Sequence, residues 1–150
     1  MIKVGDVAPD FALPTGGGDI VRLSELKGKK VVLYFYPKDN TSGCTKEACS
    51  FQDNLSALKK KRTVVLGISA DTVDSHAKFA DRFSLSFPLL SDERKEVIKV
   101  YGVWKQKSMY GRKFMGIERT TFVIDERGFI RHIFPKVKVE GHTKQVLQVL

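Results

Sequence analysis

Runs of apolar residues separated by polar stretches predict where the strands of this chain lie. Residues Val31–Tyr36 are apolar or aromatic at every position and are followed by Pro37, which is typical of a strand buried on both faces of a sheet. Residues Thr63–Ser69 form a second, mostly apolar run. The two runs therefore predict two strands suited to the centre of a sheet.

Between these runs the pattern changes to that of an amphipathic helix. Ala48, Phe51, Leu55 and Leu58 recur at helical spacing, with polar residues on the opposite face. We expect this helix to begin near residue 44, directly after a polar loop that follows the first strand. Further helices are predicted for residues 71–83, 92–101 and 142–150.

The remaining segments complete a mixed α/β pattern. Residues 11–13 and 20–23 predict a short hairpin as an N-terminal extension, residues 87–90 an edge segment, and residues 118–134 a second hairpin. The order is mostly β-α-β followed by β-β-α. It predicts one thioredoxin-like α/β domain over residues 1–150, with a central mixed sheet flanked by helices.

The composition excludes several classes of protein. At 150 residues the chain is long enough for a complete core, and its 42% hydrophobic content is ordinary for a globular protein. No run of 18 apolar residues occurs, so no transmembrane helix is predicted. The first residues, MIKVGDVAPDF, lack the apolar core of a signal peptide, which predicts a cytoplasmic protein. In that reducing compartment a catalytic disulfide is favoured over a permanent one.

The net charge of the chain says less about its function. The chain has 26 Lys and Arg residues against 17 Asp and Glu, a formal net charge of +9, which suggests nucleic acid as one candidate partner. The basic residues are scattered, however, and the densest run, Lys59–Arg62, falls where a helix should end and where cations complement the helix dipole. We therefore expect a solvated basic surface and no nucleic-acid partner. Electrostatic attraction of an acidic redox partner is an additional hypothesis.

Both cysteines lie in the segment after the first strand. Cys44 is predicted at or near a helix start, where unpaired backbone N–H groups favour the thiolate form of cysteine. Thr41 and Ser42 are candidate helix caps and short hydroxyl donors beside the sulfur. A reactive Cys44 is one interpretation, and a cysteine buried as a small hydrophobic residue is the other.

Cys49 follows Cys44 by five positions. On a continuous helix, five residues span roughly 7.5 Å along the axis and about 140° around it. A disulfide needs Cα atoms within roughly 7 Å and convergent Cβ vectors, so this pair requires the first turn or two to unwind. A pair that cycles between dithiol and disulfide suits such a place better than a permanent bridge does.

A metal site is the third interpretation of the two cysteines. They supply only half of a tetrahedral zinc site, and the three histidines, His76, His132 and His142, lie in other segments with no ligand spacing. We therefore expect no metal. His76 stands among polar neighbours and is expected at the surface of its helix.

The motif Pro37-x-x-x-Thr41-x-x-Cys44 matches the active-site signature of peroxiredoxins. The longer stretch YPKDNTSGCTKEAC resembles the Q-type branch, also called bacterioferritin comigratory proteins. The likeness covers nearly the whole chain, through GDVAPDF, SAD, FPLLSD and ERTTFVID in the family's order. Two departures are Ser42, where many relatives have proline, and Thr120, where many have serine.

The resemblance implies a role for each candidate residue. Cys44 would be the peroxidatic thiol and Cys49 the resolving thiol. Thr41 and Arg119 would stabilise the thiolate and the peroxide, although sequence alone would place Arg119 on the surface. Pro37 would shield the sulfur. Lys46 and Glu47 are candidates to act through these residues.

The resemblance also implies partners. The substrate would be hydrogen peroxide or an organic hydroperoxide, reduced as part of antioxidant defence, and a thioredoxin-like dithiol protein would recycle the enzyme. No cofactor is implied. Because the second cysteine lies in the same chain, we expect a monomer, with a weak dimer as the alternative.

Two points stay open from the sequence. A general thiol–disulfide oxidoreductase is the alternative enzyme, although it would need a C-x-x-C pair where this chain has C-x4-C. A nucleic-acid-binding module is the other alternative.

Residues 103–115 are basic and predicted to form an irregular loop at the edge of the active site. Its apolar side chains either line a peroxide or partner pocket or pack the loop down: Trp104, Met109, Tyr110 and Phe114.

Overall fold

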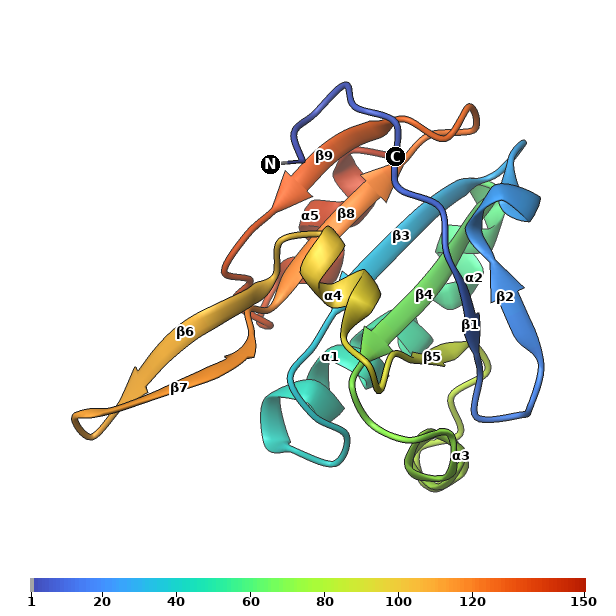
Figure 1. Cartoon of the computed structure of the whole chain (residues 1–150). Coiled ribbons are helices and arrows are strands. Elements are labelled where there is room, and N and C mark those ends of the chain that lie inside the picture. Colours follow the sequence, from blue (N-terminus) through green and yellow to red (C-terminus); the bar gives the residue numbers. More distant parts are fainter. Residues whose placement is uncertain (1) are drawn as a thin grey trace.

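A five-stranded mixed sheet forms the centre of the protein in the computed structural model, which describes residues 2–150 (Figure 1). The strand order is β5-β4-β3-β8-β9, with β3, β4 and β5 parallel and with β8 and β9 each antiparallel to the preceding neighbour. The predicted central strands and the edge position of the 87–90 segment are confirmed. The strands are β3 Lys30–Phe35, β4 Thr63–Ser69, β5 Leu89–Ser91, β8 Thr120–Ile124 and β9 Ile130–Phe134.

Both faces of this sheet are covered, which explains why β3 is apolar or aromatic at every position after Lys30. Val31 and Leu33 pack with the N-terminal segment and α4, whereas Val32 and Tyr34 pack with α1, α2, α3 and α5. Side chains alternate along a strand, so a strand between two cores must be apolar at every position. The helices are α1 Ser42–Asp53, α2 Leu55–Lys60, α3 Val73–Arg82, α4 Glu96–Val100 and α5 His142–Gln148.

The N-terminal extension is a hairpin, as predicted. Strands β1 (Ala12–Pro14) and β2 (Ile20–Arg22) pair antiparallel, and a single 3-10 turn, η1 (Leu23–Leu26), follows them. An isolated bridge from Thr15 to Leu90 joins the hairpin to the β5 edge of the sheet. The extension therefore covers an edge that would otherwise be free to pair with another chain.

Two predicted helices differ in their bounds. The helix expected from residue 44 through Leu58 is broken at Asn54 into α1 and α2, although all four of its apolar positions are buried. The helix predicted from Asp92 begins only at Glu96, because Lys95 has a left-handed φ of 62°. Asp92 instead accepts a hydrogen bond from the backbone N–H of Ile98.

The prediction of an irregular loop at 103–115 is wrong. Strands β6 (Trp104–Met109) and β7 (Arg112–Ile117) form a regular antiparallel hairpin that extends away from the central sheet (Figure 1). Its two turn residues, Tyr110 and Gly111, have φ of 52° and 76°, as a two-residue hairpin turn requires. Most of its side chains are exposed, so the alternating apolar pattern that normally marks a strand is absent. Trp104 packs against the core, whereas Met109, Tyr110 and Phe114 do not.

Across residues 2–150, the chain contains no helix with the length and apolar character needed to span a membrane.

Candidate active site

The register of the sheet brings the two distant parts of the site together. Phe35 at the end of β3 pairs with Thr120 at the start of β8, so Arg119 lies beside the loop that leaves β3. That loop turns at Asn40, which adopts a left-handed φ of 63°, a conformation that asparagine tolerates well. Helix α1 begins two residues later at Ser42.

Cys44 lies in the first turn of α1, as predicted, and is 1% exposed. The Nη2 group of Arg119 lies 3.3 Å from the Cys44 Sγ atom, within reach of a charge-assisted hydrogen bond to a thiolate. Gly43 makes this approach possible, because a Cβ atom at that position would lie 3.2 Å from Arg119 Nη2. The site therefore pairs a buried sulfur with a fixed cation.

Glu47 is the second partner of this arginine. Its Oε1 atom accepts a hydrogen bond from Arg119 Nη1 at 2.6 Å, while Oε2 is buried without a hydrogen-bond partner in the described part of the chain. Burial raises the pKa of Glu47 to about 7, although the charge and hydrogen bond of Arg119 act in the opposite direction. Cys44, Glu47 and Arg119 are called the thiol cluster below. Lys46, the other weaker candidate, is exposed.

Thr41 and Pro37 occupy the loop before the helix. Thr41 is exposed at the N-cap position, and its hydroxyl donates to the Lys38 carbonyl at 2.8 Å. Within residues 2–150, its side chain makes no hydrogen bond to the helix or to the sulfur. Pro37 is half-buried and follows the buried Tyr36. The structure thus places Thr41 and Pro37 in the loop that leads into the helix of Cys44.

Cys49 lies in the same helix as Cys44. Both cysteines are free thiols, and Cys49 is half-buried. Burial, together with the negative charge of Asp53, raises the pKa of Cys49. Because both residues lie in one regular helix, a bond between them requires that the helix open locally.

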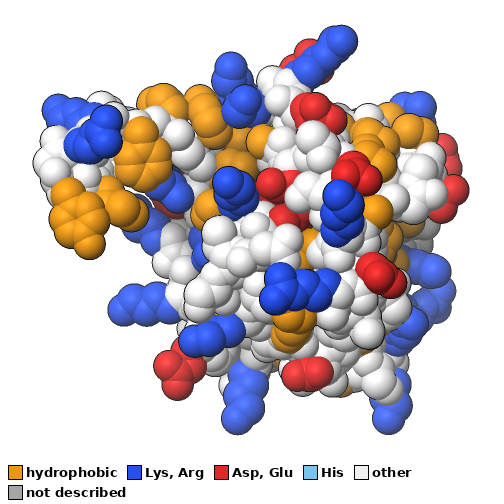
Figure 2. Space-filling view, turned by 90° about the horizontal axis from the view of Figure 1, so that it is seen from below, with side chains coloured by type: hydrophobic (Ala, Val, Ile, Leu, Met, Phe, Trp, Pro, Cys, Tyr) orange, Lys and Arg blue, Asp and Glu red, His pale blue; other side chains and the backbone are white. Residues whose placement is uncertain are grey.

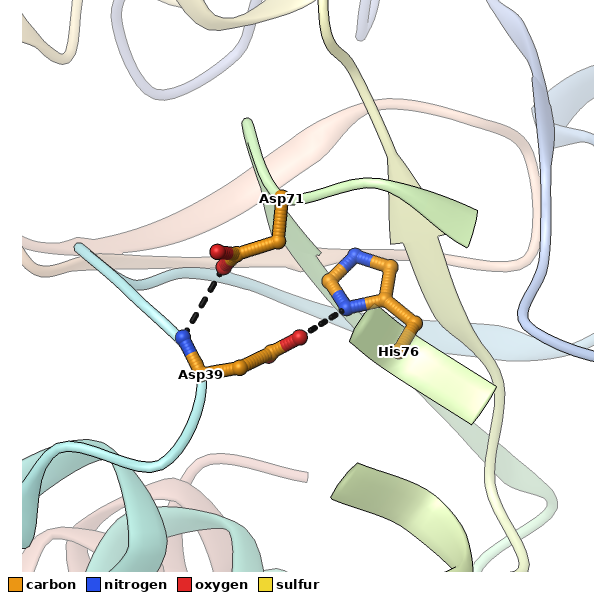
Figure 3. A group of neighbouring side chains, drawn as sticks. All are labelled: Asp39, Asp71 and His76. Atoms are coloured by element: carbon orange, nitrogen blue, oxygen red, sulfur yellow. Dashed lines mark hydrogen bonds and ion pairs between the residues drawn. The ribbon is translucent and has the colours of Figure 1, made fainter. Parts of the chain in front are cut away.

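A second buried polar group holds the loop from the other side (Figure 3). Asp39 accepts hydrogen bonds from Tyr36 Oη at 2.6 Å, His76 Nδ1 at 2.7 Å and Ser75 Oγ at 2.8 Å. Its backbone N–H donates to the Asp71 carboxylate at 2.9 Å. We call Tyr36, Asp39, Asp71, Ser75 and His76 the Asp39 network. It ties the loop after β3 to α3 and to the end of β4.

His76 is fully buried, so its predicted surface position is wrong. Its Nε2 atom faces the Leu90 carbonyl at 2.9 Å and its Nδ1 atom faces the Asp39 carboxylate. Both ring nitrogens thus lie within hydrogen-bond distance of an oxygen atom, and the ring is held between β5 and the loop after β3. Burial alone would raise the pKa of Asp39, but the hydrogen bonds from His76 and Tyr36 lower it below the ordinary value.

The sequence contained a signal for His76 that its polar neighbours obscured. His76 and Phe79 are the buried residues of α3, and their spacing of three places them on the same helical face. Asp39, His76 and Asp71 also lie close enough to be considered as metal ligands, with ligand atoms within 4.8 Å of one another. Each is already engaged in hydrogen bonds, so these groups satisfy one another without an ion.

Comparisons with known proteins agree with this arrangement. The model of the AhpC/TSA family matches residues 4–133. A relative from Coxiella burnetii is 55% identical over 146 residues, which cover 97% of each chain. Peroxiredoxin Bcp of Bacillus subtilis is 44% identical over 149 residues, which cover 99% of this chain and 95% of the relative.

Solved structures extend the likeness to the fold. A structure of the Xanthomonas campestris bacterioferritin comigratory protein, described for its alkyl peroxide reduction activity, superposes with a TM-score of 0.91 at 36% identity. The match covers 99% of this chain and 95% of that one. The thioredoxin-like fold expected from the sequence is thereby confirmed. The chain therefore belongs to the AhpC/TSA family of peroxidase enzymes, in the Q-type or bacterioferritin comigratory protein branch of the peroxiredoxins.

Proposed function

We propose that this protein reduces hydrogen peroxide and organic hydroperoxides through Cys44, as a thioredoxin-dependent thiol peroxidase. The observation that carries the proposal is the 3.3 Å approach of Arg119 Nη2 to the Cys44 sulfur. A thiolate is the reactive form of cysteine, and a fixed guanidinium beside it stabilises that form. The alkyl peroxide activity named for the Xanthomonas campestris relative supports organic hydroperoxides as substrates.

In the first step the Cys44 thiolate attacks one peroxide oxygen. The O–O bond breaks, its electron pair goes to the other oxygen, and that oxygen leaves as water or an alcohol after gaining a proton. Cys44 becomes a sulfenic acid. Arg119 and the unpaired N–H groups of the first turn of α1 would stabilise the charge as it moves onto the leaving oxygen.

Thr41 and Pro37 would assist at the mouth of the site. The Thr41 hydroxyl lies one helical turn from Cys44 and would donate to the peroxide after leaving the Lys38 carbonyl. Pro37 has no backbone N–H and would limit the access of water to the sulfur. Glu47 would position Arg119 through its 2.6 Å ion pair.

Cys49 would resolve the sulfenic acid. Its sulfur attacks the oxidised Cys44 sulfur, an intramolecular disulfide forms, and water leaves. The first turns of α1 must unwind for this step, because the intact helix holds the two residues apart. A thioredoxin-like dithiol would then return both cysteines to thiols, which completes a cycle suited to antioxidant defence. A cytoplasmic, monomeric enzyme remains our prediction.

Single-turnover oxidation of cysteine variants tests the proposal. Cys44→Ser should consume no peroxide, because it removes the nucleophile. Cys49→Ser should consume one equivalent per chain and accumulate a sulfenic acid that a dione probe labels at Cys44. The proposal fails if Cys44→Ser retains peroxide turnover, and the resolving role fails if Cys49→Ser turns over normally with thioredoxin.

A further inference from the structure

The β6–β7 hairpin has two faces of different character. Its register pairs Lys107 with Phe114 and Met109 with Arg112, and paired side chains point to the same face of a hairpin. A Cβ atom at Gly116 would touch both Lys107 and Phe114, which confirms that these side chains share one face. We call this surface the Lys107 face; it consists of Lys105, Lys107, Met109, Arg112 and Phe114.

The Lys107 face is cationic and partly apolar. Met109 is 59% exposed and Phe114 44% exposed, and no acidic residue occurs between positions 104 and 117. Figure 2 shows hydrophobic and basic side chains together on the arm that projects at the left of the molecule. Exposed apolar side chains bordered by charges of one sign are typical of a protein interaction surface.

The Lys107 face is also continuous with the thiol cluster. Strand β7 ends at Ile117, only two residues before Arg119. Burial and the charge of Arg119 lower the pKa of the Lys107 ammonium group, whereas Cys44 and Glu118 raise it. Lys107 therefore lies within electrostatic range of the thiol cluster. A partner that binds this face would therefore lie beside the start of α1, where the Cys44–Cys49 disulfide would form.

We propose that the Lys107 face is the docking surface for the dithiol protein that reduces the oxidised enzyme. This inference rests on the proposed function, because the face has this role only if a disulfide forms. The expected partner carries its thiol within an apolar patch bordered by acidic residues, complementary to Lys105, Lys107 and Arg112. Such contacts mainly raise the association rate and select the partner.

Electron transfer at this surface balances as a thiol–disulfide exchange. A thiolate of the partner attacks the Cys49 sulfur, the Cys44–Cys49 bond breaks, and its electron pair leaves on the Cys44 sulfur. The partner's second thiol then displaces Cys49, so the partner is oxidised to a disulfide and this chain gains two electrons.

The test compares two double variants on opposite faces of the same strand. Arg112→Glu with Phe114→Ser changes the Lys107 face. Lys113→Glu with Met115→Ser makes the same charge change on the other face, where Met115 is 50% exposed. Reduced thioredoxin is the protein probe, and dithiothreitol is a small reductant that needs no docking surface.

We expect kcat/KM for thioredoxin to fall about 10-fold to 100-fold in the first variant and to stay within about twofold in the second. Turnover with dithiothreitol and peroxide oxidation without reductant should be unchanged in both. Equal losses in the two variants, or no loss in the first, would overturn the inference. A wild-type protein that peroxide does not oxidise would instead remove the proposed function.

Two other occupants are separate outcomes of the same test. A wild-type dimer in sedimentation that only the first variant abolishes would identify the surface as a self-association site. Cosedimentation with phosphatidylglycerol vesicles that only the first variant loses, with normal thioredoxin kinetics, would identify a membrane-binding surface. Either result would overturn docking of the reductant.

Discussion

Asp39 and Glu47 are two buried carboxylates on either side of the start of α1, and their surroundings differ. Both oxygens of Asp39 accept hydrogen bonds, from Tyr36, Ser75 and His76. Glu47 uses one oxygen for Arg119 and leaves the other without a partner in the described part of the chain. The pKa of Asp39 is lowered as a result, whereas burial raises that of Glu47 to about 7.

This difference indicates what each group does. Fully satisfied buried networks fix one conformation, and partly satisfied ones retain capacity for a ligand or a proton. The Asp39 network is therefore suited to hold the loop in place. The thiol cluster, with its unpaired Glu47 oxygen, is suited to bind a small polar substrate and to change charge.

The largest effect should come from His76 in the Asp39 network. His76→Phe removes the buried contacts of the ring with the Asp39 carboxylate and the Leu90 carbonyl and should lower the free energy of unfolding by about 1–3 kcal/mol for each of these two groups. Urea unfolding measures this loss. His132→Phe is the matched control on an exposed strand position, where a change within about 0.5 kcal/mol is expected. A loss at His76 no larger than at His132 would show that the network does not stabilise the fold.

Replacement of Arg119 is expected to affect the rate at which Cys44 reacts with peroxide. Arg119→Ala should slow the reaction of Cys44 with peroxide by a factor of about 10²–10³, as for the loss of one charge-stabilising donor. Arg119→Lys keeps the charge but not the fork that reaches both Glu47 and Cys44, so an intermediate rate is expected. Competition with a heme peroxidase for hydrogen peroxide measures both rates. An unchanged second-order rate in Arg119→Ala would refute its assignment.

The pH dependence of stability should have opposite signs for the two carboxylates. The pKa of Glu47 is raised from 4.5 to about 7, so its stabilising contribution is complete below pH 4.5 and is lost as the pH rises through 7. The size of this loss is on the order of 3 kcal/mol, at about 1.4 kcal/mol per pKa unit. Asp39 has a lowered pKa, so its contribution is instead lost on acidification.

Glu47→Gln isolates this contribution, because glutamine stays neutral and still accepts from Arg119. Relative to the variant, the wild-type protein should lose stability as the pH rises from 4.5 to about 7, when unfolding is followed in urea. A constant difference between the two proteins over that range would mean that Glu47 is already ionised throughout.

The smallest expected effects on stability concern two stacked tyrosines, Tyr34 and Tyr36. Tyr36 donates to Asp39, whereas the Tyr34 hydroxyl is buried without a partner among the described residues. Tyr36→Phe should cost about 1–3 kcal/mol, since it leaves an Asp39 lone pair unsatisfied, and Tyr34→Phe should be neutral or slightly stabilising. Thermal unfolding of the two variants compares them directly. A larger loss at Tyr34 than at Tyr36 would contradict the contrast.

The sequence contained enough to predict the sheet and the position of Cys44. Val31–Tyr36 and Thr63–Ser69 have no polar face, and only a strand between two covered faces needs such a pattern. Arg119 was predicted through the family's motif. Its contact with Cys44 depends on the antiparallel pairing of β8 with β3, which joins residues far apart in the chain.

The features that the sequence did not predict also depend on contacts between residues far apart in the chain. His76 has polar neighbours in sequence, and only the Leu90 carbonyl and Asp39 show why it is buried. From the sequence, Glu47 and Lys46 were candidates of equal standing, because both lie within three residues of Cys44. In helix α1 the Glu47 side chain is buried and the Lys46 side chain is exposed. The β6–β7 hairpin buries little apolar surface, so its strands carry no strong periodic signal.

The proposed cycle of Cys44 and Cys49 between dithiol and disulfide can be followed by mass spectrometry together with thiol titration. The intact mass and the free-thiol content are determined before and after one equivalent of hydrogen peroxide. We expect rapid loss of both thiols and a mass lower by about 2 Da, the two hydrogens removed when an intramolecular disulfide forms. Thiols and mass that stay unchanged for minutes would contradict it.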